Sequence, residues 1–384
     1  MPLFLRDRKI RGYIFQLITI IGVVAFLWYI GTNTVHNIEQ RGIKTGFGFL
    51  HSTAGFGIDD TPISYNPSDT YGRVFLVGLL NTLIVSFWAI VLSTIVGLII
   101  GVLRLSENWV VKKLAAAYIE IFRNIPILLQ ILFWYNVVLR SLPSPRQSIN
   151  IFGKIFINNR GIYTPEPAWN STTISVIISI IAVVIFVYFL NKWSNKRQEL
   201  TGQEFPVLPI AIVLFIVAPI IGYFIGGANF DFSYPHLKGF NFQGGKQYYP
   251  EFVALTMAIT IYTATFIAEA VRSGIEAVAK GQKEAAASLG LTPYQALKLV
   301  ILPQAVRIAI PPTINQYLNI VKNSSLATAI GYPELVTVFA GTTLNQTGQA
   351  IEIISITMLV YLLISLIVSA ILNWLNFKMK IKER

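Results

Sequence analysis

The chain contains no cysteine, so disulfides and thiolate metal sites are excluded, and its compartment cannot be inferred from redox chemistry. It is also poor in charge, because only 12% of its 384 residues are Asp, Glu, Lys or Arg whereas 54% are hydrophobic. Its three histidines, His36, His51 and His236, are far apart, and we expect them in solvated loops outside the membrane rather than in a metal site. A soluble core cannot bury so much apolar surface, so the composition predicts a membrane-spanning protein.

Motifs for catalysis are also missing. The pattern G-x-x-x-x-G-K-[ST], which cradles nucleotide phosphates, does not occur, and the most similar stretch, GFNFQGGKQ, has the wrong spacing. Nothing resembles a nucleophile elbow, a histidine pair or a pair of catalytic carboxylates. We therefore predict no catalytic residue, no metal and no cofactor, and we expect that the chain is not an enzyme.

Long apolar runs predict the membrane-spanning segments. A helix needs roughly 20 apolar residues to cross the hydrocarbon layer. Five runs without Asp, Glu, Lys or Arg are longer than this: Gly12 to Ile38, Val74 to Leu103, Pro167 to Asn191, Phe205 to Phe230 and Ile353 to Phe377. Three more are interrupted by charge: about Leu114 to Leu139, Phe252 to Val271 and Val306 to Ala329. The fold class predicted is an all-α polytopic membrane protein with about eight transmembrane helices.

The distribution of Lys and Arg predicts the orientation, because positively charged loops stay in the cytoplasm. With both termini inside, nineteen Lys and Arg fall in inside segments and nine in outside segments. The formal net charge of +12 is thus explained by topology, and we predict no nucleic-acid partner. The basic start RDRKIR precedes a run too long for a signal-peptide core and without a small-x-small cleavage site, so we expect an uncleaved helix.

Three long outside connections are predicted. In the first, between Asn33 and Arg73, FGFLHSTAGFGI indicates a short surface helix whose apolar side chains lie in the membrane interface. The others, Ser141 to Glu166 and Asp231 to Glu251, are rich in Pro, Tyr and Phe. They are read either as plain loops or as part of an interfacial aromatic belt.

A polar stretch between two apolar segments, residues 276–304, predicts a helical elbow. The first helix ends at Gly290, a residue type that tolerates the left-handed conformation of a helix C-terminus. Thr292, Pro293 and Gln295 then give an N-cap, a first helical residue and a capping box for a second helix. Pro303 is expected to end or bend that helix.

The elbow resembles the cytoplasmic loop of bacterial ABC importer permeases. Glu284, Ala285 and Ala286 stand at the family's spacing before Gly290, and Val300, Ile301, Leu302 and Pro303 follow at the expected distance, with Val300 in place of Ile. An ordinary amphipathic hairpin on the membrane surface is the structural alternative. Further segments match polar amino-acid permeases, in particular the larger subunit of general L-amino-acid systems: GLLNTLIVS (78–86), IEIFRNIPILLQI (119–131), YTATFIAEAVRSGIEAVAKGQKEAAASLGL (262–291) and NIVKNSSLATAIG (319–331).

The resemblance implies a domain organisation. A transmembrane domain at 74–384 would contain the family's core of five helices, the coupling elbow at 276–304 and an inserted helix pair at 172–226. Residues 1–73 would form an additional N-terminal helix and its outside loop. Because two inserted crossings cancel, the orientation of the core is unchanged.

Charges within the spans are the candidate functional residues, since a charge at mid-bilayer costs about 2.5 to 3.5 kcal/mol on insertion scales. Lys322 follows fourteen uncharged residues and precedes Asn323, Ser324 and Ser325. An ammonium group suits a substrate carboxylate, and hydroxyl or amide oxygens suit an α-ammonium group, so these four residues are predicted to bind substrate. The alternative is that they join neighbouring helices.

Two pairs spaced i, i+3, Glu120 with Arg123 and Glu269 with Arg272, lie near the cytoplasmic ends of their spans. Mutual neutralisation is the simpler interpretation and a gate is the functional one.

The resemblance implies an ATP-driven importer permease that takes up amino acids delivered by a periplasmic binding protein. It implies as partners a dimer of ATP-binding subunits on the elbow, a second related permease in a heterodimer, and membrane lipid in a bacterial inner membrane. An ion-coupled secondary amino-acid transporter is the alternative function. It would need carboxylates near the bilayer midplane and repeated halves, and neither is visible in the sequence.

Overall fold

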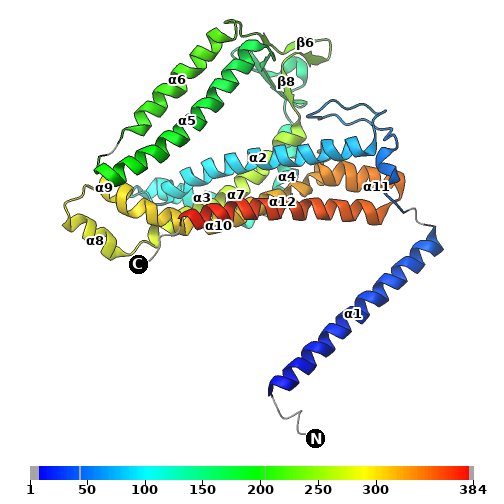
Figure 1. The fold of residues 1–384 in the computed structure, drawn as a ribbon. Coiled ribbons are helices and arrows are strands. Elements are labelled where there is room, and N and C mark those ends of the chain that lie inside the picture. Colours follow the sequence, from blue (N-terminus) through cyan, green and yellow to red (C-terminus); the bar gives the residue numbers. More distant parts are fainter. Residues whose placement is uncertain (1–7, 43–44, 204, 380–384) are drawn as a thin grey trace. The chain divides into compact units, whose positions relative to one another are not determined.

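The computed structural model describes residues 8–42, 45–203 and 205–379, and these are mostly helical (Figure 1). The long helices are α1 (Arg8–Arg41), α2 (Tyr71–Arg104), α3 (Trp109–Asn124), α5 (Ser171–Thr201), α6 (Val207–Ile225), α7 (Pro250–Glu276), α10 (Leu302–Asn323) and α12 (Ala350–Met379). Short α-helices are α4 (Ile127–Leu132), α8 (Lys280–Ser288), α9 (Pro293–Ala296) and α11 (Leu344–Thr347). Phe133–Leu139, Leu297–Ile301 and Val336–Thr343 are π-helical, and Gly48–His51, Pro145–Gln147 and Ser324–Ile330 are 3-10 helical.

Seven helices of the described residues are long and apolar enough to cross a membrane, and an interrupted pair raises the number to eight if it counts as one span. This confirms the predicted fold class. The interrupted pair consists of α3 and the helical segment 127–139, where the sequence predicted one run. The break has a local cause, because a residue before proline is pushed toward extended backbone, and Ile125 before Pro126 has φ −91° and ψ 125°.

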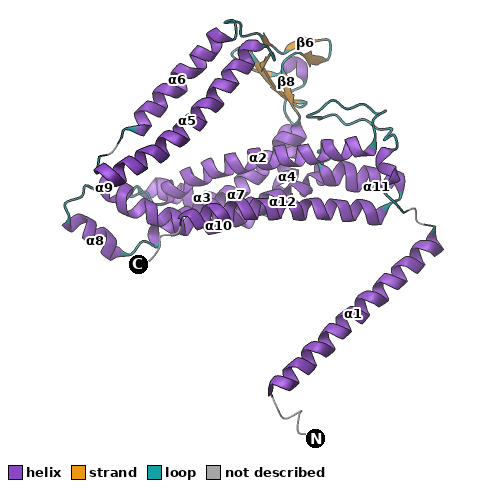
Figure 2. Ribbon diagram, viewed as in Figure 1, coloured by secondary structure: helices purple, strands orange, loops and turns teal. Residues whose placement is uncertain are grey.

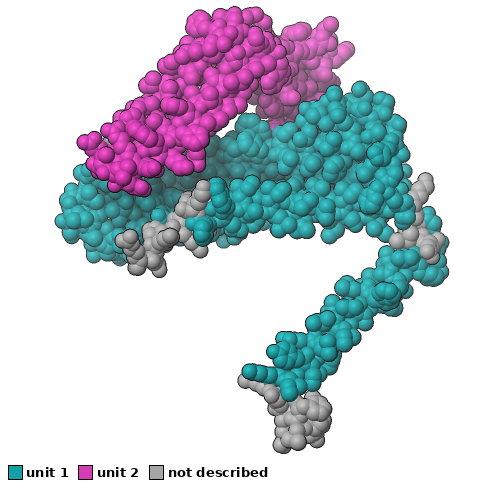
Figure 3. All heavy atoms as spheres, in the orientation of Figure 1, with its two compact units in different colours: residues 1–125, 259–384 teal, residues 126–258 magenta. Residues whose placement is uncertain are grey.

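The chain divides into two compact units (Figure 3). Unit 1 comprises residues 1–125 and 259–384, and unit 2 comprises residues 126–258. The predicted insertion, 172–226, lies within unit 2.

In unit 1, α2 packs against α3 and α10, and α10 packs against α12. Small residues on α2 allow it to approach α7 closely. A Cβ atom added to Gly101 would lie 2.8 Å from the Cβ of Val271 and 2.9 Å from the carbonyl oxygen of Ala268. Small residues at the contact between two helices are typical of membrane proteins, because they let the backbones approach closely.

The segment after α1 contributes to the core of unit 1. The predicted surface helix is a single 3-10 turn, Gly48–His51, and its Phe49 is 6% exposed. The Phe49 ring lies 6.1 Å from that of Phe339, within an apolar cluster that also contains Tyr71 and Ile353. The expectation that this segment's apolar side chains lie in the membrane interface is therefore wrong for Phe49, which packs inside the protein.

Unit 2 contains a hairpin of two long helices, α5 and α6, and all the strands of the described residues (Figure 2). The strands are β1 (Ile149–Ile151), β2 (Ile155–Asn158), β3 (Gly161–Thr164), β4 (Glu166–Pro167), β5 (Phe232–Ser233), β6 (His236–Lys238), β7 (Asn241–Gln243) and β8 (Lys246–Tyr248). One antiparallel sheet has the order β1-β2-β3-β8, while β4 pairs with β5 and β6 with β7. The segments before α5 and after α6 therefore join into one small domain instead of forming plain loops.

This strand domain has its own aromatic core. The Phe242 ring lies 4.7 Å from that of Phe156 and 4.8 Å from that of Tyr163. Tyr163 is 2% exposed, and burial raises the pKa of its hydroxyl. The hydroxyls of Ser171 and Thr172 donate to the carbonyl oxygen of Gly226, at 2.7 and 2.8 Å, and so join the start of α5 to the end of α6.

Candidate functional site

The elbow between α7 and α10 has the predicted local structure. Gly290 has φ +72°, in the left-handed region. Its amide donates to the carbonyl of Ala287 at 2.9 Å, and the amide of Leu291 donates to that of Ala286 at 3.1 Å. These two bonds form a Schellman motif, which satisfies carbonyls at the end of α8.

The second helix of the elbow begins with a capping box. The amide of Gln295 donates to the Thr292 hydroxyl at 3.3 Å, and the amide of Thr292 donates to the side-chain oxygen of Gln295 at 2.9 Å. Pro303 does not end this helix. The π-helical segment Leu297–Ile301 precedes it and changes the hydrogen-bond pattern before the residue that lacks an amide hydrogen, so the helix continues into α10.

The elbow presents an apolar surface. Among the elbow residues that match the family pattern, Ala286 is 3% exposed and packs α8 against the protein. Glu284, Ala285 and Leu302 are exposed. Leu289, Tyr294 and Leu299 are 81%, 70% and 59% exposed. Exposed side chains of this kind, on a polar segment between membrane spans, indicate a protein interface.

Of the two predicted ion pairs, the structure forms one. Arg272 donates to Glu269 and also to Glu276, so its guanidinium bridges two turns of α7. The described residues contain no salt bridge between Glu120 and Arg123. Instead, the guanidinium of Arg123 lies 5.5 Å from the centre of the Phe266 ring of α7. Arg123 and Arg272, the arginines of the two predicted pairs, thus both contact side chains of α7.

The predicted substrate residues lie at the end of α10 but do not form a single cluster. Lys322 is exposed, and Asn323 and Ser325 are half-buried. Ser324 is 0% exposed, and its hydroxyl donates to the carbonyl of Val321 at 2.7 Å. Ser324 therefore belongs to the helix packing, whereas Lys322 is accessible.

Two residues that the sequence analysis did not select continue the face of Lys322. Asn315 and Asn319, seven and three positions before it, are exposed, and this spacing puts all three on one side of α10. Within residues 8–42, 45–203 and 205–379, the side chains of Asn315, Asn319 and Lys322 have no hydrogen-bond partner. We call Asn315, Asn319 and Lys322 the polar stripe. The signal was present in the sequence, because amides at this spacing within a span are unusual.

The polar stripe cannot face lipid at low cost, since a polar group without a partner in hydrocarbon costs several kcal/mol, or about 2 to 7 kcal/mol by transfer scales. Hydroxyls on the same helix avoid this cost locally. Thr313 donates to the carbonyl of Ala309 at 2.7 Å, and Ser325 to that of Lys322 at 2.7 Å. The amides and the ammonium group of the stripe therefore require water, a ligand or another chain.

Comparisons with known proteins identify the family. The family described as "Binding-protein-dependent transport system inner membrane component" matches residues 200–381. The putative amino-acid ABC transporter permease protein YhdX of Escherichia coli (strain K12) is 50% identical over 375 residues, which cover 98% of this chain and 95% of that protein. The chain belongs to the ABC transporter permeases.

Two further relatives of this permease span nearly its whole length. The general L-amino acid transport system permease protein AapQ of Rhizobium johnstonii is 45% identical and covers 98% of this chain and 94% of its own. The glutamate/glutamine/aspartate/asparagine transport system permease protein BztB of Rhodobacter capsulatus is 38% identical and covers 100% and 97%. The family confirms that the permease is a multi-pass membrane subunit and that ATP hydrolysis belongs to a separate subunit. It excludes the ion-coupled alternative.

The permease also contains a buried carboxylate that the sequence analysis missed. Glu334 is 0% exposed and accepts hydrogen bonds from the amides of Val336 and Thr337, at 2.9 and 2.8 Å, and from the Tyr361 hydroxyl at 3.0 Å. Burial raises the pKa of Glu334, and the backbone hydrogen bonds oppose this rise. Through Tyr361, Glu334 connects the segment after Ser324–Ile330 to α12.

The segment GLLNT of α2 holds the same region in place. The Asn81 amide donates to the carbonyl oxygens of Asp60 and Pro333, at 2.8 and 2.9 Å, and the amide of Leu335 donates to the Thr82 hydroxyl at 3.2 Å. Asn81 is 1% exposed. These residues position the chain that follows the polar stripe.

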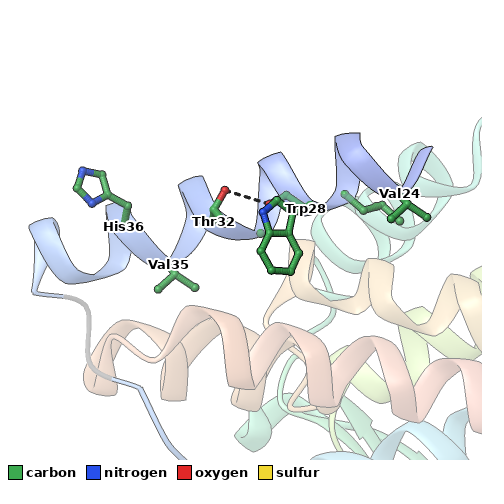
Figure 4. Close-up of a pocket in the computed structure, with 7 residues that line it drawn as sticks. Val24, Trp28, Thr32, Val35 and His36 are labelled. Atoms are coloured by element: carbon green, nitrogen blue, oxygen red, sulfur yellow. Dashed lines mark hydrogen bonds between the residues drawn. The ribbon is translucent and has the colours of Figure 1, made fainter. Parts of the chain in front are cut away.

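A surface hollow on α1 carries no comparable chemistry (Figure 4). Its seven lining residues all come from α1, including Val24, Trp28, Thr32, Val35 and His36. The Thr32 hydroxyl donates to the carbonyl of Trp28 at 3.0 Å, within the helix. His36 was expected in an outside loop, which is wrong, because α1 extends to Arg41. Its Nε2 lies 2.9 Å from the side-chain nitrogen of Gln40, so it contacts its own helix.

Proposed function

We propose that this permease takes up amino acids, and that the polar stripe of α10 lines their path across the membrane. The observation that carries the proposal is the presence of two amides and one ammonium group on one exposed face of a membrane helix, without partners in the described residues. Lys322 is suited to the α-carboxylate of the substrate through a charge-assisted hydrogen bond. The relatives named for amino-acid transport support this substrate class.

In this proposal the elbow couples ATP hydrolysis to transport. We infer that the ATP-binding subunit docks on the exposed Leu289, Tyr294 and Leu299, and that the fixed turn at Gly290 transmits its movement to α8 and α10. A second permease, related but distinct, completes the path, because one helix face cannot enclose a substrate. Asn323 and Ser325 contribute from the adjoining turn.

The topology proposed for the bacterial inner membrane places both termini in the cytoplasm. The elbow is then cytoplasmic and the strand domain of unit 2 is outside. Support comes from the nineteen-to-nine distribution of Lys and Arg between inside and outside segments. A soluble binding protein delivers the substrate on the outside.

The path is tested by labelling, since the chain has no cysteine of its own. Asn315→Cys and Asn319→Cys should react with a charged, membrane-impermeant thiol reagent in the assembled complex, and transported amino acids should slow the reaction. Met358→Cys on α12, 68% exposed and surrounded by apolar residues, is the control and should react only with a membrane-soluble reagent. Equal behaviour of all three variants would place the polar stripe against lipid and contradict the proposal.

A further inference from the structure

Seven of the eight strands of unit 2 lie in two segments whose charged side chains are all cationic. These segments, residues 141–165 and 232–249, contain no Asp or Glu, whereas the eighth strand, β4, contains Glu166. Their five cationic side chains are Arg146, Lys154, Arg160, Lys238 and Lys246. All five are exposed. In the proposed topology the domain lies outside, where segments close to membrane helices are normally depleted of Lys and Arg. The rule that places positive charge in the cytoplasm therefore does not explain the five Lys and Arg of these segments.

The hairpin formed by β1 and β2 ends in a strained aromatic residue. Phe152 has φ +54° and Gly153 has φ +70°. The amide of Lys154 donates to the carbonyl of Ile151 at 3.2 Å, which closes a turn with two left-handed residues. Turns of this kind favour Asn or Gly at the first position, and a phenylalanine with positive φ is an outlier.

Burial of the Phe152 side chain does not offset the cost of its strained backbone. Its side chain is 94% exposed, and its neighbours Ile149 and Ile151 are 47% and 36% exposed. Aromatic side chains surrounded by other exposed apolar and cationic groups are the common energetic centres of protein interfaces. An exposed phenylalanine with positive φ is thus unfavourable for the stability of the isolated domain but suited to binding a partner.

Strand register shows where the hairpin tip lies in the sheet. Ile151 pairs with Ile155 at the tip, whereas Asn158 pairs with Gly161 at the opposite end of β2. At that opposite end Ile162 pairs with Tyr248, and β8 continues directly into α7. The tip therefore lies at the end of the sheet away from the start of this membrane helix. Lys246, which pairs with Thr164, lies toward the same end as the tip.

We propose that the β1–β2 hairpin tip, with Phe152 as its apolar anchor and Lys154 and Lys246 as its cationic rim, docks an acidic surface of the soluble binding protein. The inference rests on the proposed function, which requires such a protein on the outside. The position of the tip away from the start of α7 favours a soluble protein over lipid. Exposed cations accelerate the encounter with an acidic partner, and the aromatic anchor slows its dissociation.

The decisive variant is Phe152→Asn, because it separates folding from binding. Asparagine tolerates positive φ, so the purified complex should keep or raise its thermal unfolding temperature. Its affinity for the binding protein that stimulates the wild-type ATPase should fall at least about tenfold, as expected for loss of an interface centre. The matched control is Trp169→Ala, which removes an aromatic side chain 78% exposed in the segment between β4 and α5 and should leave the affinity unchanged.

The charges are tested with Lys154→Gln combined with Lys246→Gln. Association with the binding protein should slow and depend less on salt, since two of the five cations no longer contribute to the screened attraction. Unchanged affinity in Phe152→Asn, or a larger effect of Trp169→Ala, would overturn the docking site. Binding of the wild-type complex to vesicles of anionic lipid, lost in Phe152→Asn while affinity for the binding protein is retained, would overturn it in favour of a lipid contact.

Failure of this inference is distinguishable from failure of the proposed function. If docking is weakened alone, the Phe152→Asn complex still takes up amino acids when the binding protein is supplied far above the weakened dissociation constant. If the wild-type complex itself takes up no amino acid at any binding-protein concentration, the proposed function is wrong.

Discussion

Gly97 of α2 and Ile267 of α7 are so close that a Cβ atom added to the glycine would lie 2.6 Å from the Cβ of the isoleucine. Real Cβ atoms essentially never approach this closely, and Ile267 is 1% exposed, so it has no space to move into. The two helices therefore cross at fixed spacing one turn before Gly101.

The first prediction follows from this contact. Gly97→Ala should destabilise the subunit by about 1 to 3 kcal/mol, as overpacking of a core does. Thermal unfolding in detergent measures the effect. Gly22→Ala is the control, because Gly22 on α1 has no atom within 4 Å of such a Cβ, and it should be neutral or slightly stabilising. Equal stability of the two variants would mean that α2 and α7 are not in close contact.

The second prediction concerns coupling at the elbow. Gly290→Val places a β-branched side chain at φ +72°, which costs about 1 to 2 kcal/mol. The variant should insert and assemble but hydrolyse ATP without proportionate uptake. Gly290→Asn should retain coupling, because Asn tolerates the left-handed region. Gly281→Ala in α8, where no positive φ is required and the added Cβ meets nothing, should behave as wild type. Normal coupling in Gly290→Val would remove the fixed turn from the mechanism.

Topology provides the third prediction. Single cysteines replacing Arg197 and the C-terminal Arg384 should be labelled only from the cytoplasm, and a cysteine replacing Lys246 only from outside. The reason is the asymmetric distribution of Lys and Arg between inside and outside segments. Impermeant reagents added to intact cells and to inverted vesicles measure it. Labelling of the Lys246→Cys variant from the cytoplasm alone is incompatible with eight spans.

The elements that sequence predicts well here are those with local causes. Gly290, Thr292 and Gln295 act within a few residues of one another, and the structure shows both the left-handed turn and the capping box. The long spans follow from apolar composition. Pro303 was harder to interpret, because a π-helical segment compensates for it and the helix continues.

The remaining features depend on contacts distant in sequence. The sheet needs β3 and β8 to pair, although Thr164 and Lys246 are separated by the whole α5–α6 hairpin, and its strands are only three or four residues long. Likewise, the role of Asn81 became visible only through its hydrogen bond to Pro333. Among the candidate site residues, Lys322 and Ser324 are neighbours in sequence but differ in burial, because the 3-10 turn after α10 directs Ser324 inward.

Uptake kinetics of Lys322→Met, normalised to assembled complex, test the central claim most directly. The substitution keeps the length and apolar stem of the side chain but removes the charge, so folding should be preserved or eased. Loss of one charge-assisted hydrogen bond to the substrate carboxylate is worth about 1.5 to 3 kcal/mol, which predicts an apparent affinity weaker by roughly ten- to hundredfold. An unaltered apparent affinity combined with a lower yield of assembled complex would contradict the account and assign Lys322 to helix packing.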